Sequence, residues 1–126
     1  MNTRNVELCN LAIEEIRKDP ERIWMAVVSS GKFYCIAGLI SKISGFDIEN
    51  KSWAETMNNA SNLLLCENNT FTKYGSFIPA QATVRLFFVV DWPKSFAERL
   101  YTTYRGTKEY AEVVCERIAH WRDTGE

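Results

Sequence analysis

The chain has 126 residues, of which 46% are hydrophobic and 25% charged, and its formal net charge is −1. This balance excludes the disordered and fibrous classes and predicts one globular domain, residues 1–126, with a sizeable core. A near-neutral chain gives no overall attraction to duplex nucleic acid or to an anionic membrane surface. No apolar run approaches the roughly 20 residues of a spanning helix, and the first residues lack a signal-peptide core, so we expect a cytoplasmic protein.

The cysteines give no sign of a metal or redox site. They stand far apart, at Cys9, Cys35, Cys66 and Cys115, without a Cys-x-x-Cys pair, and His120 is the only histidine. We therefore expect no metal and no cofactor. In a cytoplasmic protein such cysteines are reduced and behave as small apolar groups.

Helical spacing is the first pattern along the chain. Apolar residues recur every three or four positions over about Thr3–Lys18, and Asp19-Pro20 ends the pattern. Two β-prone runs then flank Ser30-Gly31, which leaves a short hairpin near residues 25–36 as an open alternative. Helical spacing returns at Ile36 and ends at Gly45, since glycine favours the left-handed conformation that closes helices.

A capping box at Ser52-Trp53-Ala54-Glu55 predicts the start of a helix that runs through Leu64. Residues 66–78, polar and glycine-containing, are expected to form a long loop. Pro79 fits the first turn of a helix through Leu86. Because TVRLFFVV has strand propensity, helix and strand both stay open for residues 80–90.

Two more helices are expected in the last third of the chain. A second capping box, at Ser95 to Glu98, predicts a helix that ends near Gly106 and buries Phe96, Leu100 and Tyr104. Thr107 then caps a final helix, closed by Gly125, whose core face carries Ala111, Val114, Ile118 and Trp121. These elements predict a mainly α fold, a compact single-domain bundle of about five to six helices.

Three segments resemble, in the same order, a family of small uncharacterised bacterial and phage proteins. They are YCIAGLI, RLFFVVDWPKSFAERLY and RIAHWRDTG, matching a Cys-x-Ala-Gly segment, an aromatic stretch ending in Trp-Pro and a C-terminal Arg-Ile-x-His-aromatic helix. The resemblance spans roughly residues 24–125 and implies a helical fold and a microbial setting, but no reaction. Lys32-Phe33-Tyr34 stands where relatives carry a further cysteine, which weakens any metal or redox role.

The one catalytic hypothesis that the residues support is a cysteine-dependent hydrolase. Cys35 lies at the predicted start of a helix, where the positive end of the helix dipole lowers a thiol pKa, as at the nucleophile position of papain-like peptidases. His120 is the only imidazole base, and Asp91 or Glu116 is a candidate to orient it. The alternative interpretation is that Cys35 is a buried structural cysteine and His120 a capping or surface histidine. Other catalytic motifs are missing from the sequence.

One segment departs from the even charge of the chain. Between Phe71 and Lys108 lie nine of the sixteen aromatic residues, with six basic residues against two acidic ones. Arginine and aromatic side chains stack on bases, pair with phosphate and anchor protein interfaces. The predicted binding residues are Arg85, Trp92, Arg99, Tyr101 and Arg105. Core packing is the competing explanation, above all for the phenylalanines.

These patterns together predict a small non-catalytic intracellular binding protein. Its expected partner is a nucleotide-like anionic ligand or another protein, on behalf of a phage or mobile element. The hydrolase built on Cys35 and His120 is the alternative. The oligomeric state stays open.

Overall fold

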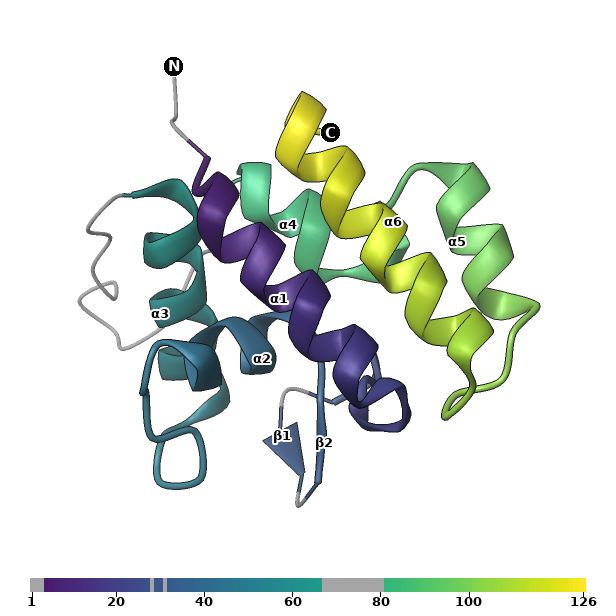
Figure 1. The fold of residues 1–126 in the computed structure, drawn as a ribbon. Helices are drawn as coiled ribbons and strands as arrows, with labels where there is room; N and C mark the ends of the chain where they lie inside the picture. Colours follow the sequence, from purple (N-terminus) through teal and green to yellow (C-terminus); the bar gives the residue numbers. More distant parts are fainter. Residues whose placement is uncertain (1–3, 28, 31, 67–80) are drawn as a thin grey trace.

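The computed structural model describes residues 4–27, 29–30, 32–66 and 81–126, and over these residues the fold is mainly helical, as predicted (Figure 1). The short hairpin is also present, as an antiparallel pair in which Ser29 faces Tyr34 and Ser30 faces Phe33. The α-helices are α1 (Val6–Lys18), α2 (Ile36–Ile43), α3 (Trp53–Leu65), α4 (Gln81–Phe87), α5 (Lys94–Tyr101) and α6 (Lys108–Thr124). The shorter elements are the 3₁₀ turns η1 (Pro20–Arg22) and η2 (Val89–Asp91) and the strands β1 (Ser29–Ser30) and β2 (Phe33–Tyr34).

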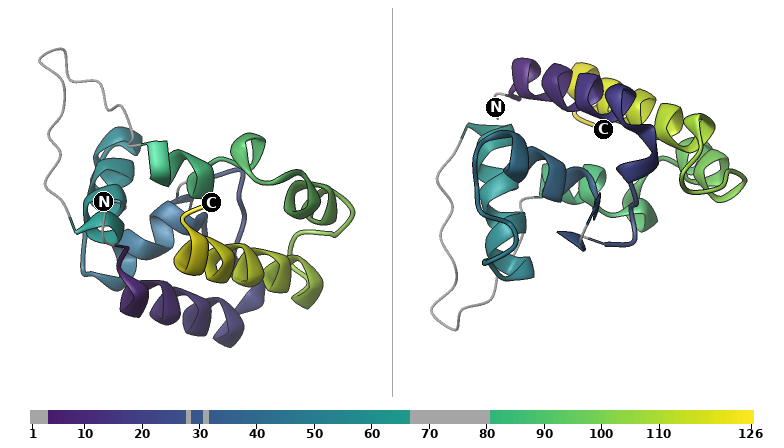
Figure 2. Two further views of the ribbon diagram at one scale, coloured as in Figure 1. Left: turned by 90° about the horizontal axis from the view of Figure 1, so that it is seen from above. Right: turned by 60° about the horizontal axis from the view of Figure 1, so that its bottom comes forward.

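The helices form two layers. Helices α1 and α6 lie side by side and run in opposite directions, and α2, α3 and α4 cover one side of this pair (Figure 2). Helix α5 packs on α6 at the edge of the molecule (Figure 1). Within the described residues, no helix combines the length and the apolar character that crossing a membrane requires.

The apolar face predicted for α6 is the centre of the core. Ala111, Val114, Ile118 and Trp121 are all buried, and the indole of Trp121 donates a hydrogen bond to the carbonyl of Ala82 at 2.8 Å. Helical spacing alone was sufficient to predict this face. Burying it against α1 and α4 holds the two layers together.

Helix boundaries follow local hydrogen bonds. Ser52 accepts a hydrogen bond from the Glu55 amide, and Thr107 accepts one from the Tyr110 amide, so both predicted N-caps are confirmed. Gly125, with φ of +75°, closes α6 as predicted. Helix α1 begins at Val6, later than predicted, because the Asn5 side chain caps it.

The capping box predicted at Ser95 is wrong. Helix α5 begins at Lys94, and Pro93 is its N-cap, so Ser95 lies inside the first turn and caps nothing. Proline fixes φ near the helical value and presets the entry of the chain at this point. Helix α5 also ends at Tyr101, which leaves Tyr104 84% exposed and outside the core, against prediction.

Residues 81–87 are helix and not strand, which settles the open alternative over that range. Leu86 and Phe87 are buried on one side of α4, so packing overrides the strand propensity of this run. Pro79 and the loop predicted from residue 67 on lie outside the described residues.

A buried arginine joins α4 and α5 to α6. Arg117 is 0% exposed, and its Nη2 donates to the main-chain oxygens of Arg85 and of Glu126, the latter at 2.5 Å. Its guanidinium carbon lies 5.7 Å from the ring centroids of both Trp92 and Phe96. Burial lowers the pKa of Arg117 to about 10, which still leaves the group charged at neutral pH.

Substitutions at Thr107 and Ser95 test where α6 and α5 begin. Thr107→Ala should lower the free energy of unfolding by about 1 kcal/mol, because the Tyr110 amide loses its cap. Ser95→Ala should change it by less than about 0.5 kcal/mol, since Ser95 is exposed and makes no cap. Urea unfolding followed by circular dichroism measures both. A loss at Ser95 as large as that at Thr107 would contradict the observed start of α5.

Candidate functional site

Three parts of the chain meet around a cleft of about 430 Å³, which we call the aromatic cleft. They are the turn after η1, the η2 segment, and the region from α5 to the first turn of α6. The lining residues are Trp24, Met25 and Ala26; Val89; Leu100, Tyr101, Thr103 and Arg105; and Tyr110.

The turn at Trp24 is fastened on both sides. The Trp24 amide donates to the carbonyl of Tyr34 at 2.9 Å, which ties the turn to the hairpin. The Met25 amide donates to the hydroxyl of Tyr110 at 3.0 Å, which ties it to α6. Ile23, fully buried, anchors the preceding position. The wall of the cleft formed by the turn is therefore fixed by hydrogen bonds before any ligand binds.

Arg105 is the cationic group of the cleft. Its guanidinium carbon lies 3.9 Å from the ring centroid of Trp24 and 4.7 Å from that of Phe33. The two rings meet edge to face, with centroids 5.7 Å apart. Among the residues that the structure describes, no carboxylate pairs with Arg105. Gly106, with φ of +87°, makes the turn that directs the chain from Arg105 into α6.

Two tyrosines complete the polar character of the cleft. Burial raises the pKa of the Tyr110 hydroxyl, while the Met25 amide and Arg105 act in the opposite direction, so this hydroxyl is protonated at neutral pH. Tyr101 is 73% exposed and leaves its ring open to solvent. The cleft thus offers a guanidinium, a hydroxyl and flat apolar faces to a bound molecule.

The structure brings together two of the five predicted binding residues, Tyr101 and Arg105, in this cleft. Arg99 lies on α5, next to Leu100, but its Nη2 pairs with the carboxylate of Glu116. Its charge is therefore satisfied within the protein.

The other two predicted residues lie elsewhere. Arg85 on α4 pairs with Glu126, with 3.5 Å between Nη1 and Oε1. Trp92 is only 5% exposed, and its indole donates to the carbonyl of Leu86 at 2.7 Å. The prediction that Trp92 binds a ligand therefore does not agree with its burial in the core.

Trp24, Phe33 and Tyr110 belong to this site, although the sequence did not single them out. Trp24 and Phe33 lie in a run that predicts a hairpin, and Tyr110 lies in the first turn of a predicted helix. Trp24 and Phe33 belong to it through their contact with Arg105, and Tyr110 through its hydrogen bond with Met25. No local sequence pattern predicts these contacts.

Cys35 is at the N-cap of α2, as predicted, but it is buried, with 4% of its surface exposed. Burial raises the pKa of its thiol, and this outweighs the lowering effect of the Gly38 and Ala37 amides. His120 packs against Phe96 instead, with ring centroids 5.3 Å apart. In the described part of the chain, no hydrogen bond joins Cys35 to His120.

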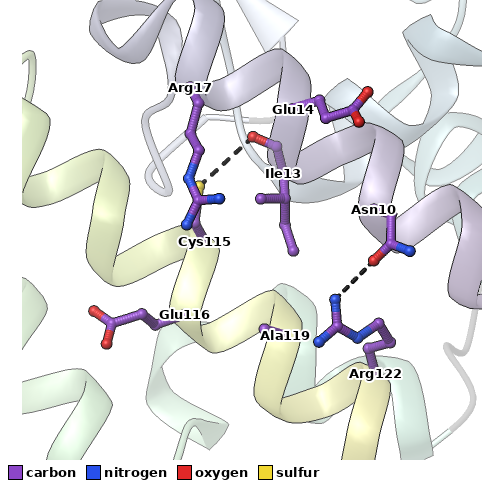
Figure 3. Close-up of a pocket in the computed structure, with 8 residues that line it drawn as sticks. All are labelled: Asn10, Ile13, Glu14, Arg17, Cys115, Glu116, Ala119 and Arg122. Carbon is purple, nitrogen blue, oxygen red and sulfur yellow. Dashed lines mark hydrogen bonds between the residues drawn. The ribbon is translucent and has the colours of Figure 1, made fainter.

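A second hollow, of about 340 Å³, lies between α1 and α6 (Figure 3). Both arginines that line it pair with carboxylates: Arg122 with Asp123 at 2.9 Å and Arg17 with Glu112 at 2.8 Å, and Arg122 also donates to Asn10 at 2.7 Å. On its floor the Cys115 thiol donates to the carbonyl of Ile13 at 3.8 Å. Among the described residues that line this groove, no cation is left without a carboxylate partner, so the aromatic cleft is the better candidate.

No family model, curated protein or solved structure matches the chain. The suspected family therefore stays a prediction from the quoted motifs. The functional assignment depends on the geometry of the aromatic cleft.

The burial of Cys35 predicts its reactivity. Iodoacetamide at neutral pH should modify the exposed Cys66 and leave Cys35 unmodified until denaturant is added, because a buried thiol with a raised pKa supplies little thiolate. Mass spectrometry of the digested protein distinguishes the two sites. Modification of native Cys35 as fast as that of Cys66 would instead favour the hydrolase.

Buried thiols also predict how stability depends on pH. Burial raises the pKa of Cys9 to about 11 and that of Cys115 to about 12, from an ordinary value near 9. Above pH 9 the unfolded chain loses these protons while the folded chain keeps them, so the free energy of unfolding should fall as pH rises toward 11.

Cys115→Ala should make this decline less steep, by at most about 1.4 kcal/mol per pH unit. Urea unfolding at several pH values measures the slope, and Cys66→Ala, at an exposed position, is the control. An unchanged slope in Cys115→Ala would show that this thiol does not contribute to the alkaline loss of stability.

Proposed function

We propose that the protein is a small non-catalytic binding protein that captures an anionic, nucleotide-like ligand in the aromatic cleft. The observation that carries this proposal is Arg105, stacked on Trp24 and without a carboxylate partner among the described residues. Aromatic rings position a guanidinium but do not neutralise it. The charge is therefore held in place for an anion, and a planar fork of donors suits phosphate or carboxylate.

The remaining features of the cleft suit the flat part of such a ligand. Its volume of about 430 Å³ is in the usual range of small-molecule sites, roughly 300 to 1,000 Å³. Stacking of a base on an aromatic side chain contributes about 1 to 3 kcal/mol, and the exposed ring of Tyr101 is available for it. We place this activity in the cytoplasm of a bacterial or phage-infected cell, because three segments of the chain resemble bacterial and phage proteins and the sequence predicts no signal peptide.

A partner protein is the second candidate, and exposed residues next to the cleft favour it. Val90 is 85% exposed and Tyr104 84% exposed, and both directly adjoin residues that line the cleft. Tyrosine, tryptophan and arginine dominate the energetic centres of protein interfaces. The hydrolase has less support, because Cys35 is buried and has no hydrogen bond to His120 in the described residues.

Replacing Arg105 tests the proposal. Arg105→Met should weaken the binding of AMP by tenfold or more, since a charge-assisted contact contributes roughly 1.5 to 3 kcal/mol. Isothermal titration calorimetry with AMP, GMP, CMP and UMP measures the effect. The melting temperature should change little, because Arg105 is exposed.

Arg99→Met is the matched control, because Arg99 is also an exposed arginine but pairs with Glu116 and does not line the cleft. Its affinity for AMP should stay near that of the wild type. Equal weakening by both substitutions would point to a general charge effect. A wild-type protein that binds none of the four nucleotides would refute a nucleotide-like ligand.

A further inference from the structure

Another cavity, of about 210 Å³, adjoins the aromatic cleft, and we call it the Cys35 pocket. Its own lining residues are Val27, Cys35, Trp53, Met57, Phe87 and Phe88. Met25 and Ala26 line this pocket and the aromatic cleft alike. The two cavities therefore meet at Met25 and Ala26.

The same two chain segments pass both cavities. In the turn after η1, residues 24–26 line the cleft and residues 25–27 line the pocket. In the second segment, Val89 lines the cleft while Phe87 and Phe88 line the pocket. Because each segment is continuous, the cavities lie next to each other, and we call the two together the trough.

The trough changes character along its length. The cleft carries Arg105, Tyr101, Thr103 and Tyr110. The described residues of the pocket carry no charged side chain, and the thiol of Cys35 is their one polar side-chain group apart from the indole of Trp53. Trp53 is 53% exposed, so the pocket has an aromatic edge that solvent reaches. Only a molecule that is charged at one end and apolar at the other would fill both parts.

We infer that the ligand is an amphipathic anion, with its negative group at Arg105 and an apolar group in the Cys35 pocket. This inference rests on the proposed function and specifies the class of ligand. An engineered cavity of about 150 Å³ is sufficient to bind benzene, so a pocket of about 210 Å³ accommodates an aromatic ring or a short branched chain. Two sources share this chemistry, a nucleotide with an apolar substituent and a fatty-acid-like carboxylate.

Three probes test the inference on the full chain by isothermal titration calorimetry. AMP has the anion and the base alone, N-methylanthraniloyl-AMP adds an aromatic group on the ribose, and octanoate has an anion and an apolar chain without a base. N-methylanthraniloyl-AMP should bind at least tenfold more tightly than AMP, since burying an aromatic group strongly favours binding. Equal affinities for the two nucleotides would overturn the inference.

Val27→Trp should fill the Cys35 pocket and bring the ratio of the two nucleotide affinities toward one. Val90→Trp is the matched control, because Val90 is 85% exposed and lines neither cavity, and it should keep the ratio. Val27→Phe, a smaller enlargement, replaces Val27→Trp if that variant does not fold. A filled pocket with an unchanged ratio would also overturn the inference.

The octanoate titration distinguishes the two sources. Binding of octanoate that Val27→Trp abolishes supports the amphipathic anion and assigns it a fatty-acid-like source, even if AMP does not bind and the nucleotide-like ligand of the proposed function fails. No binding of octanoate, together with the tenfold advantage of N-methylanthraniloyl-AMP, supports the same class with a nucleotide source. Loss of AMP binding in Arg105→Met tests the proposed function alone.

Discussion

The buried guanidinium of Arg117 is the interaction on which the arrangement of α4, α5 and α6 depends. It donates to the main-chain oxygens of Arg85 and Glu126 and lies beside the rings of Trp92 and Phe96. Its Nε and Nη1 have no hydrogen-bond partner among the described residues, and the guanidinium carbon lies 5.7 Å from each ring centroid. Arg117 is fully buried, so solvent does not compensate its charge. Displacing the carbonyl groups or the rings around it would therefore cost free energy.

The packing around Arg117 also positions the aromatic cleft, because α5 contributes to both. Phe96 attaches α5 to α6 by its contact with Arg117. The same helix and the turn after it carry Leu100, Tyr101, Thr103 and Arg105 into the cleft. The cleft is therefore built between two fixed supports, α5 on one side and the turn at Trp24 on the other.

Much of the fold could be predicted from the sequence, because it depends on neighbours along the chain. The caps at Ser52 and Thr107 and the apolar face of α6 need only local spacing. The same local pattern at Ser95 does not form a cap, because Pro93, two residues earlier, sets the start of α5. The burial of Trp92 likewise depends on Leu86 and Arg117, whose positions come from tertiary packing.

The candidate site was predictable only in part, for an electrostatic reason. The sequence marks the basic segment but cannot say which arginines find acids elsewhere in the chain. Arg85 and Arg99 pair with Glu126 and Glu116. Arg105 stacks instead on rings from a distant turn and hairpin, which fix its position and leave its charge unneutralised. Its neighbours in space, and not its place in a basic segment, therefore make Arg105 the residue suited to binding an anion.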